Sequence, residues 1–333
     1  MRSIKKNSFF LWEEGQGEGM EFRTKIPITP QEPAIGYDSK ILLLGSCFVE
    51  NIGRKLEYHK FRTLQNLFGI LFQPAAISNF LQKVKSQYIF TEEDIFYYNE
   101  RWHSFDAHSV ISNPHKDKML QELNAAVEET YSFLKEASHV IITPGTSWGY
   151  KLKETGKTVA NCHKLPQKNF TKGLTDVKVD LMECIEIITL LNPEASIIFT
   201  VSPVRHLKDG FVENQRSKAG LISAIHELIG ILPSGVGSYF PSYEIMMDEL
   251  RDYRFYAEDM VHPNSVAIDY IWQRFIQAWM TTETQKISEE VEKVQKGLAH
   301  KPFNEHSEAH QQFRKKLQQK INELQVRFPR IEF

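Results

Sequence analysis

The sequence has few cysteines, no long apolar run and almost no net charge, and each of these absences excludes a class of protein. Of its 333 residues only Cys47, Cys162 and Cys184 are cysteines; the three cannot all pair, and none has CxxC spacing. A reducing compartment suits this usage, so we expect a cytoplasmic protein. No apolar run approaches the roughly 20 residues that span a bilayer, so we expect no membrane partner.

Positive and negative charges nearly cancel along the chain. Lysine and arginine together number 40 and aspartate and glutamate 42, which gives a net charge of −2. This balance gives no support to a nucleic-acid partner. The N-terminus starts with basic residues, but its apolar stretch "SFFLW" is too short for a secretory signal. We expect residues 1–19 to be a disordered extension, with Met20 as a candidate start.

Apolar strand-like runs alternate with amphipathic helical stretches over residues 20–280. This alternation predicts an α/β fold with a mostly parallel sheet covered by helices on both faces. A less regular segment, 91–108, is expected to be an inserted hairpin or lid. The predicted strands are 41–44, 139–144, 196–203 and 236–243, and the predicted helices are 74–86, 115–137, 175–191, 214–232 and 264–280.

The last segment, residues 281–333, is highly charged and helical in pattern. We predict a pair of solvent-exposed helices here, as a charged C-terminal extension of the main body. A coiled coil or a partner-binding helix is the alternative, but the apolar heptad pattern is sparse. The sequence leaves the oligomeric state open.

Four polar stretches follow predicted strands or precede the last helix of the body. They read "GSCF", "PGTSWGY", "SPVRH" and "AEDMVHPN". The carboxyl ends of parallel strands meet at one edge of a sheet, so these stretches should become neighbours. In the last one, Asp259 stands three residues before His262, so its carboxylate is placed to hold the imidazole and leave one ring nitrogen free as a base.

Ser46 lies where the first predicted strand meets a helix. A serine at that junction is either a nucleophile or an ordinary helix cap. Ser46, Asp259 and His262 in this order match a nucleophile, acid and base.

Five motifs in order resemble the GSCFA-domain family, which belongs with the SGNH/GDSL-like hydrolases. They are "LGSCFVENIGRKL", "NLFGILFQP", "TPGTSW" with "VANCHK", "TVSPVRH" and "DMVHPN". The resemblance covers about residues 20–280; Val49 stands where the family name has alanine. It implies a flavodoxin-like three-layer α/β/α fold and a serine esterase or acyltransferase site.

Carried over by position, the resemblance implies Ser46, Asp259 and His262 as the triad and Gly69 as an oxyanion-hole residue through its backbone N–H. One block departs from the wider superfamily, which has an asparagine after a glycine where this chain has Gly145-Thr146-Ser147. The missing donor is then a hydroxyl or a side-chain amide. The candidates are Thr146, Ser147, Asn66 and Asn161.

Other candidate chemistry is less favoured. "GSCFVENIGR" has its glycines eight apart, unlike a phosphate-binding loop, and His103, His108 and His115 lack metal-ligand spacing, so we expect no cofactor and no metal. Cys47 is an alternative nucleophile, and Cys162 with His163 is an alternative nucleophile–base pair. We prefer a substrate-binding role for the remaining polar residues of these blocks. They are His163, Arg205 and His206.

Two functions remain. The first is a serine esterase or acyltransferase acting on an O-acyl ester, with a small-molecule or glycan ester as substrate. The second is a non-catalytic small-molecule or glycan-binding module that keeps the hydrolase fold. The triad residues favour the first, and the altered block favours the second.

Overall fold

A five-stranded parallel sheet forms the centre of the molecule in a computed structural model that describes residues 24–233, 235–304 and 306–333. The predicted disordered extension 1–19 and Met20 lie outside these ranges. Every neighbouring pair of strands is parallel. The order is β2-β1-β5-β9-β10, with bounds β1 Lys40–Gly45, β2 Arg62–Gln65, β5 His139–Thr143, β9 Ser196–Phe199 and β10 Gly237–Tyr239.

Strand β1 shows why the sheet is buried on both sides. Its aliphatic side chains alternate between two hydrophobic clusters, with Ile41 and Leu43 in one and Leu42 and Leu44 in the other. The first cluster includes α1 (Cys47–Tyr58) and α7 (Ser265–Trp279), and the second includes helices on the opposite face. Those helices are α2 (Pro74–Ser86), α3 (Lys116–Leu134), α4 (Val177–Leu191) and α5 (Phe211–Ile229).

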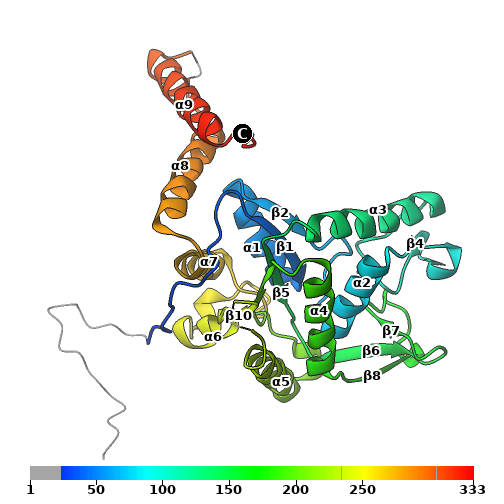
Figure 1. Ribbon diagram of the computed structural model, residues 1–333. Helices are drawn as coiled ribbons and strands as arrows, with labels where there is room; N and C mark the ends of the chain where they lie inside the picture. The colour runs from blue at the N-terminus through cyan, green and yellow to red at the C-terminus, as the bar shows by residue number, and fades with distance from the viewer. Residues whose placement is uncertain (1–23, 234, 305) are drawn as a thin grey trace, which may run out of the picture.

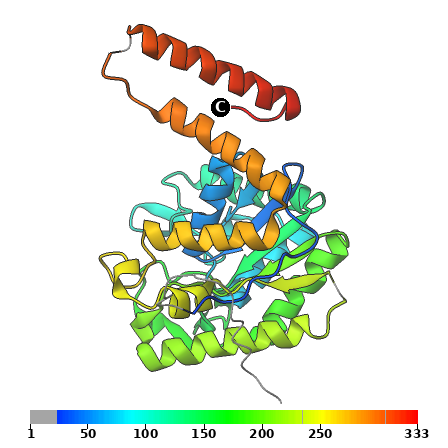
Figure 2. The same ribbon diagram turned by 90° about the vertical axis from the view of Figure 1, so that its left-hand side faces the viewer.

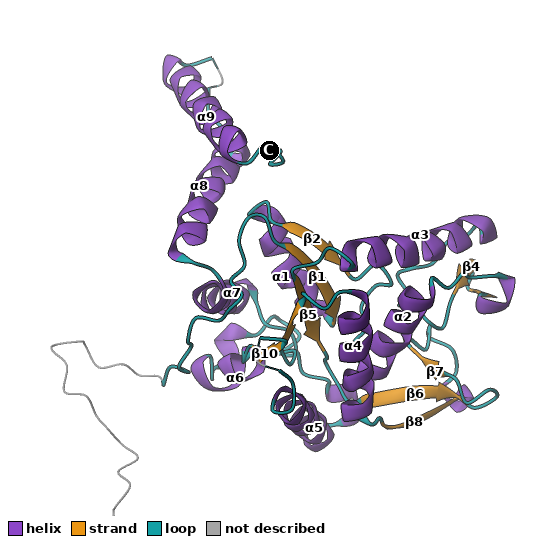
Figure 3. Ribbon diagram, in the orientation of Figure 1, coloured by secondary structure: helices purple, strands orange, loops and turns teal. Residues whose placement is uncertain are grey.

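The predicted three-layer α/β/α fold is therefore confirmed, and Figure 3 shows the strands between the two helical layers. All four predicted strands are present. The additional strand β2 escaped prediction because "RTLQ" is short and largely polar, as an edge strand can be. Strands β1 and β5 are neighbours in the sheet, but the chain continues from β1 to β2 at one edge and from β5 toward β9 and β10 at the other. This is the switch point at which such folds bind ligands.

Two insertions are added to this body, and both lie toward the α2 side of the molecule (Figure 1). The first is the predicted hairpin, in which β3 (Phe96–Tyr98) pairs antiparallel with β4 (Arg101–His103). The second is a small antiparallel sheet that was not predicted, because glycine and lysine interrupt its strands. Its strands are β6 (Trp148–Leu152), β7 (Thr158–Val159) and β8 (Phe170–Leu174).

The C-terminal extension is the predicted pair of helices, α8 (Thr282–Ala299) and α9 (Glu308–Arg327). In Figures 1 and 2 this pair projects from the body. Both helices nevertheless contribute buried side chains, such as Val291 and Leu324, to the hydrophobic cluster that includes α1 and α7, so the predicted solvent exposure of the pair holds only in part. Ile331 is buried, and the Arg330 guanidinium donates to the backbone oxygen of Lys60 at 3.2 Å. No helix within the described ranges is long and apolar enough to cross a membrane.

The remaining elements are short. They are α6 (Ser242–Glu244), a π-helix (Ile245–Glu249), and 3-10 helices at Glu92–Asp94, Gln167–Asn169, Leu207–Asp209 and Tyr253–Phe255.

Candidate active site

Ser46 joins β1 to α1 and is built into the structure at both ends. Its backbone N–H donates to the Thr143 carbonyl at 2.9 Å, which ties it to the end of β5. Its Oγ accepts from the Phe48 N–H at 3.3 Å, so the side chain caps α1. The residue is only 1% exposed. In this conformation Ser46 has the geometry of a buried helix cap.

The backbone just before Ser46 is held by a side-chain clamp. The Asn66 amide accepts from the Gly45 N–H at 2.9 Å and donates to the Gly45 carbonyl at 3.2 Å. Gly45 itself has a φ of 139°, and a Cβ there would collide with the Thr143 carbonyl. Only glycine lets the two strand ends approach this closely. The side-chain amide of Asn66, one of the predicted oxyanion donors, therefore already bonds to Gly45 and holds the end of β1 in place.

Asp259 and His262 form the predicted hydrogen-bonded pair. Asp259 Oδ2 lies 2.6 Å from His262 Nδ1, while Oδ1 accepts the backbone N–H groups of Val261 and His262 at 2.9 and 3.0 Å. These hydrogen bonds, that of the His262 backbone first, lower the pKa of Asp259 to about 2. Nε2 of His262 has no hydrogen-bond partner among the described residues. The pair therefore presents a free ring nitrogen, as a general base must.

Hydrogen bonds between loops bring the polar stretches to one edge of the sheet. The Arg205 N–H donates to the Val261 carbonyl at 3.2 Å, which joins the segment after β9 to the Asp259–His262 turn. Ser46 is joined to β5 through Thr143. Within the described part of the chain, however, no hydrogen bond links Ser46 Oγ to His262. Ser46 and His262 therefore lie at the same edge of the sheet, and no hydrogen bond joins their side chains within the described residues.

Lys218, on α5, lies at the same edge and was missed from the sequence. Its ammonium donates to the carbonyls of Gly145 and Ser202 at 2.7 and 2.6 Å, which joins the segments after β5 and β9. It is 1% exposed, and no carboxylate pairs with it among the described residues. Burial lowers its pKa to about 7, and the nearby Cys47 opposes this effect.

A signal for Lys218 was present in the sequence. It occupies a position in the apolar stripe of α5, three residues before the buried Leu221 and seven before the buried Ile225. A lysine at such a position either extends its aliphatic chain along the protein and places its ammonium in solvent, or it buries the ammonium. Only the packing of the two strand-end loops around it distinguishes these possibilities.

Some of the implied oxyanion donors are already engaged in hydrogen bonds within the chain. The Ser46 N–H donates to Thr143, as described, and the Gly69 N–H donates to the Asn66 carbonyl at 2.6 Å in a tight turn. Thr146 Oγ1 lies 2.9 Å from the hydroxyl of Ser217. The other two candidates differ, because their side-chain donors, the Ser147 hydroxyl and Nδ2 of Asn161, have no hydrogen-bond partner among the described residues. Ser147 is buried, and the Asn161 side chain accepts from the His163 N–H at 2.8 Å.

Of the predicted substrate-binding residues, Arg205 and His206 lie at the site edge. The Arg205 guanidinium stacks over the Tyr256 ring at 4.0 Å. His206 Nε2 is 2.6 Å from the position that a Cβ on Gly145 would take, and it has no partner among the described residues. Burial first, then the charges of Lys218 and His262, lowers the pKa of His206 to about 3. The imidazole is therefore neutral near pH 7.

His163 instead lies in an aromatic cluster with the first insertion. Its ring is 5.0 Å from that of His103 and packs edge-on against Phe96 and Phe105. Neither ring nitrogen has a hydrogen-bond partner within the described part of the chain, and burial is the main cause that lowers the pKa of His163 to about 4. Over the described ranges no three His, Cys, Asp or Glu side chains are grouped to hold a metal ion.

Comparison with known families covers nearly the whole described chain. The model of the GSCFA family matches residues 40–275, from the start of β1 into α7, and so includes every candidate site residue. The model named GSCFA domain protein, C-terminal domain, matches residues 291–333. No curated protein matches the sequence. Since the first match spans well over half of the chain, the protein belongs to the GSCFA family.

Proposed function

We propose that this protein is an SGNH-type serine esterase or acyltransferase acting on an O-acyl ester of a small, carbohydrate-like substrate. The observation that supports it most is the 2.6 Å bond between Asp259 and His262, with Nε2 of the imidazole unpartnered in the described structure. A carboxylate on Nδ1 fixes the ring and its tautomer and stabilises the imidazolium that forms during proton transfer. The position of Ser46 at the switch point of the sheet supports the same proposal.

In the proposed reaction, Ser46 Oγ attacks the ester carbonyl while His262 Nε2 takes its proton. The proton then passes to the departing alcohol, which leaves an acyl group on Ser46. Water or a second alcohol attacks this acyl group, again with His262 as the base. The choice between these two attackers distinguishes hydrolysis from acyl transfer.

This proposal requires the Ser46 region to rearrange when substrate binds. Ser46 Oγ must leave the Phe48 N–H and meet His262, and the backbone N–H groups of Ser46 and Gly69 must turn toward the substrate oxygen. Thr146, Ser147, Asn66 and Asn161 are the candidates for a third donor. Releasing a serine cap costs about 1 kcal/mol, which is small beside the several kcal/mol that oxyanion donors supply.

The alternative is a non-catalytic binding module for a small molecule or glycan. A specific observation favours it, because Ser46 is 1% exposed and both backbone donors are already bonded within the chain. A module of this kind would retain the pocket edge without an activated serine.

Labelling with a fluorophosphonate probe tests the proposal, because only an activated serine reacts quickly. We expect the natural chain to be labelled and Ser46→Ala to lose labelling and esterase turnover. Cys47→Ala should remain labelled if the neighbouring thiol is not the nucleophile. Absence of labelling in the natural chain would contradict the esterase and favour the binding module.

Ser307→Ala is a matched control for the cap role of Ser46. Ser307 caps α9, where its Oγ accepts from the His310 N–H at 3.2 Å. Both alanine variants should lose about 1 kcal/mol of stability as their helix caps are removed. Only Ser46→Ala should also lose labelling. Equal labelling of the two variants would show that Ser46 is a cap alone.

A further inference from the structure

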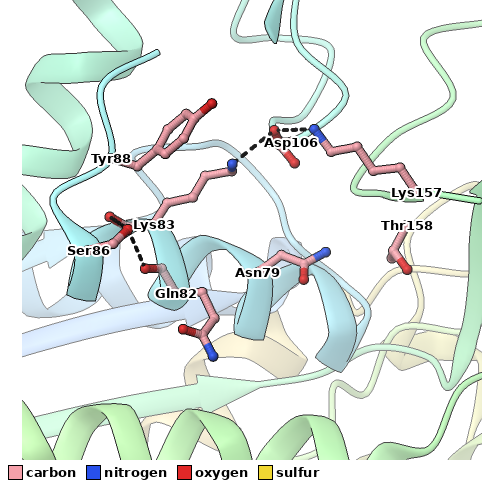
Figure 4. Close-up of a pocket in the computed structure, with 8 residues that line it drawn as sticks. All are labelled: Asn79, Gln82, Lys83, Ser86, Tyr88, Asp106, Lys157 and Thr158. Atoms are coloured by element: carbon pink, nitrogen blue, oxygen red, sulfur yellow. Dashed lines mark hydrogen bonds and ion pairs between the residues drawn. The ribbon is translucent and has the colours of Figure 1, made fainter. Parts of the chain in front are cut away.

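The outward side of α2 faces the two insertions across an open space. Asn79, Lys83 and Ser86 lie on one side of this helix, three or four residues apart. Asp106, which follows β4, and the 157–158 stretch at the start of β7 face them from the insertions. An open pocket of about 410 Å³ lies between these elements (Figure 4).

Charge in this pocket is unbalanced. The Asp106 carboxylate is 3% exposed, and its Oδ2 lies 2.9 Å from the Lys157 ammonium and 3.5 Å from that of Lys83. No other lining residue of the pocket carries a charge. Two ammonium groups thus share one buried carboxylate, and one positive charge is left over. Figure 4 shows all three charged groups at the same end of the pocket.

Unpartnered neutral polar groups face the same space. Neither the Asn79 amide nor the Thr158 hydroxyl has a hydrogen-bond partner in the described part of the chain. In Figure 4 the Asn79 amide is directed toward the gap beside Lys157 and Thr158. Every side chain that lines this pocket, the Tyr88 ring included, ends in an amide, a hydroxyl or a charged group, whereas small-molecule pockets are usually lined mainly by hydrophobic residues. Its occupant should therefore be a polar molecule.

We propose that this pocket binds a hydroxyl-rich small molecule that carries one acidic group, such as a sugar carboxylate or a sugar phosphate. The acidic group pairs with the ammonium groups of Lys83 and Lys157, which Asp106 already bridges, and neutralises the excess positive charge. Sugar hydroxyls bond to Asn79 and Thr158. None of these residues belongs to the proposed triad, so this site does not depend on the esterase activity.

Calorimetric titration of the full chain with three probes tests this site. The probes are glucuronate, glucose 6-phosphate and neutral glucose. We expect at least one of the two acidic probes to bind and glucose not to bind, with affinity falling as salt is raised. The acidic probe that binds better identifies the acidic group as a carboxylate or a phosphate. Equal binding of glucose, or no binding by any probe, would overturn the proposal.

Variants locate the binding. Lys83→Met and Lys157→Met should each weaken the acidic probe about tenfold, since each removes a charge-assisted hydrogen bond. Lys85→Met is the matched control, because Lys85 is exposed on α2 and does not line the pocket. Lys157 is 43% exposed, so its replacement should leave the fold intact, as thermal unfolding will show. Natural affinity in both pocket variants would place the binding elsewhere and refute this site.

Discussion

The two halves of the candidate active site differ in how firmly the fold holds them. Ser46 and Lys218 are each 1% exposed and are tied to strand-end carbonyls. The side chains of Asp259 and His262, by contrast, are 50% and 47% exposed, and their hydrogen bonds stay within one turn. The Asp259–His262 pair therefore already has the arrangement that the proposed proton transfer requires, whereas Ser46 serves as a helix cap in this conformation.

This difference follows from what each half must do for folding. Ser46 ends a central strand and begins a helix, so its polar groups are buried and must be paired. Asp259 and His262 lie in a turn before α7, where solvent is available and the carboxylate pairs locally. In the proposed reaction, such a site reacts with its substrate only after Ser46 Oγ has left the Phe48 N–H.

Asp259→Asn tests the exposed half and should have the largest effect. Asparagine can still accept the two backbone N–H groups, but its amide hydrogen faces Nδ1 of His262 and favours the wrong tautomer. Esterase turnover should fall about 10³- to 10⁴-fold, with little change in stability. Turnover on a small acetyl ester and urea unfolding measure the two quantities.

Asp252→Asn is the matched control for this variant. Asp252 also accepts a backbone N–H, that of Arg254 at 2.8 Å, and it is exposed. It should retain natural turnover. An equal loss in both variants would assign the effect to turn structure rather than to His262.

Lys218→Met tests the buried half through the pH dependence of stability. Burial lowers the pKa of Lys218 to about 7 in the folded chain, whereas an unfolded lysine has a pKa of about 10.4. Between these values the unfolded state binds one more proton, so the unfolding free energy rises with pH by up to about 1.4 kcal/mol per pH unit. The variant should lack this contribution in urea unfolding between pH 7 and 9.

Lys208→Met provides the comparison, because Lys208 is exposed on the segment before α5. The unfolding free energy of Lys208→Met should depend on pH in the same way as that of the natural chain. If the stability of Lys218→Met shows the same pH dependence as that of the natural chain, the pKa of Lys218 does not differ between the folded and unfolded states over this range.

His163→Phe should have the smallest effect on stability, because the folded and unfolded pKa values of His163 differ by less than those of Lys218. Burial lowers the pKa of His163 to about 4, against about 6.5 in the unfolded chain. The unfolded state binds more protons between these values, so the natural chain loses stability as pH falls from 6.5 toward 4. Phenylalanine removes this loss, and thermal unfolding from pH 7 to 5 measures it.

His300→Phe is the control, since His300 is exposed at the end of α8. Its acid sensitivity should equal that of the natural chain. Part of the sensitivity should persist in His163→Phe, because burial also lowers the pKa of His206 to about 3. If His163→Phe is as acid-sensitive as His300→Phe, the cluster around His163 does not drive the acid response.

Much of the fold could be predicted because periodicity is a local property of the chain. The aliphatic run of β1 and the helix that begins at Pro74 each follow from neighbouring residues. The Asp259–His262 bond was also predictable, because its partners are three residues apart in one turn. The strands β6, β7 and β8 were not, since glycine and lysine disrupt their alternation and contacts distant in the sequence, such as the bond from Gln73 to the Val159 carbonyl, help to stabilise them.

Residue type and local pattern thus specify the layers of the fold, the edge where the polar loops gather and the acid–base turn. Tertiary structure alone decides the rest. It buries Lys218 against carbonyls 16 and 73 residues away in the chain, and it places Asp106 beside Lys157, 51 residues further along. Such contacts depend on how the loops and insertions pack, because the free energy of a buried charge is set by the atoms around it and not by its neighbours in sequence.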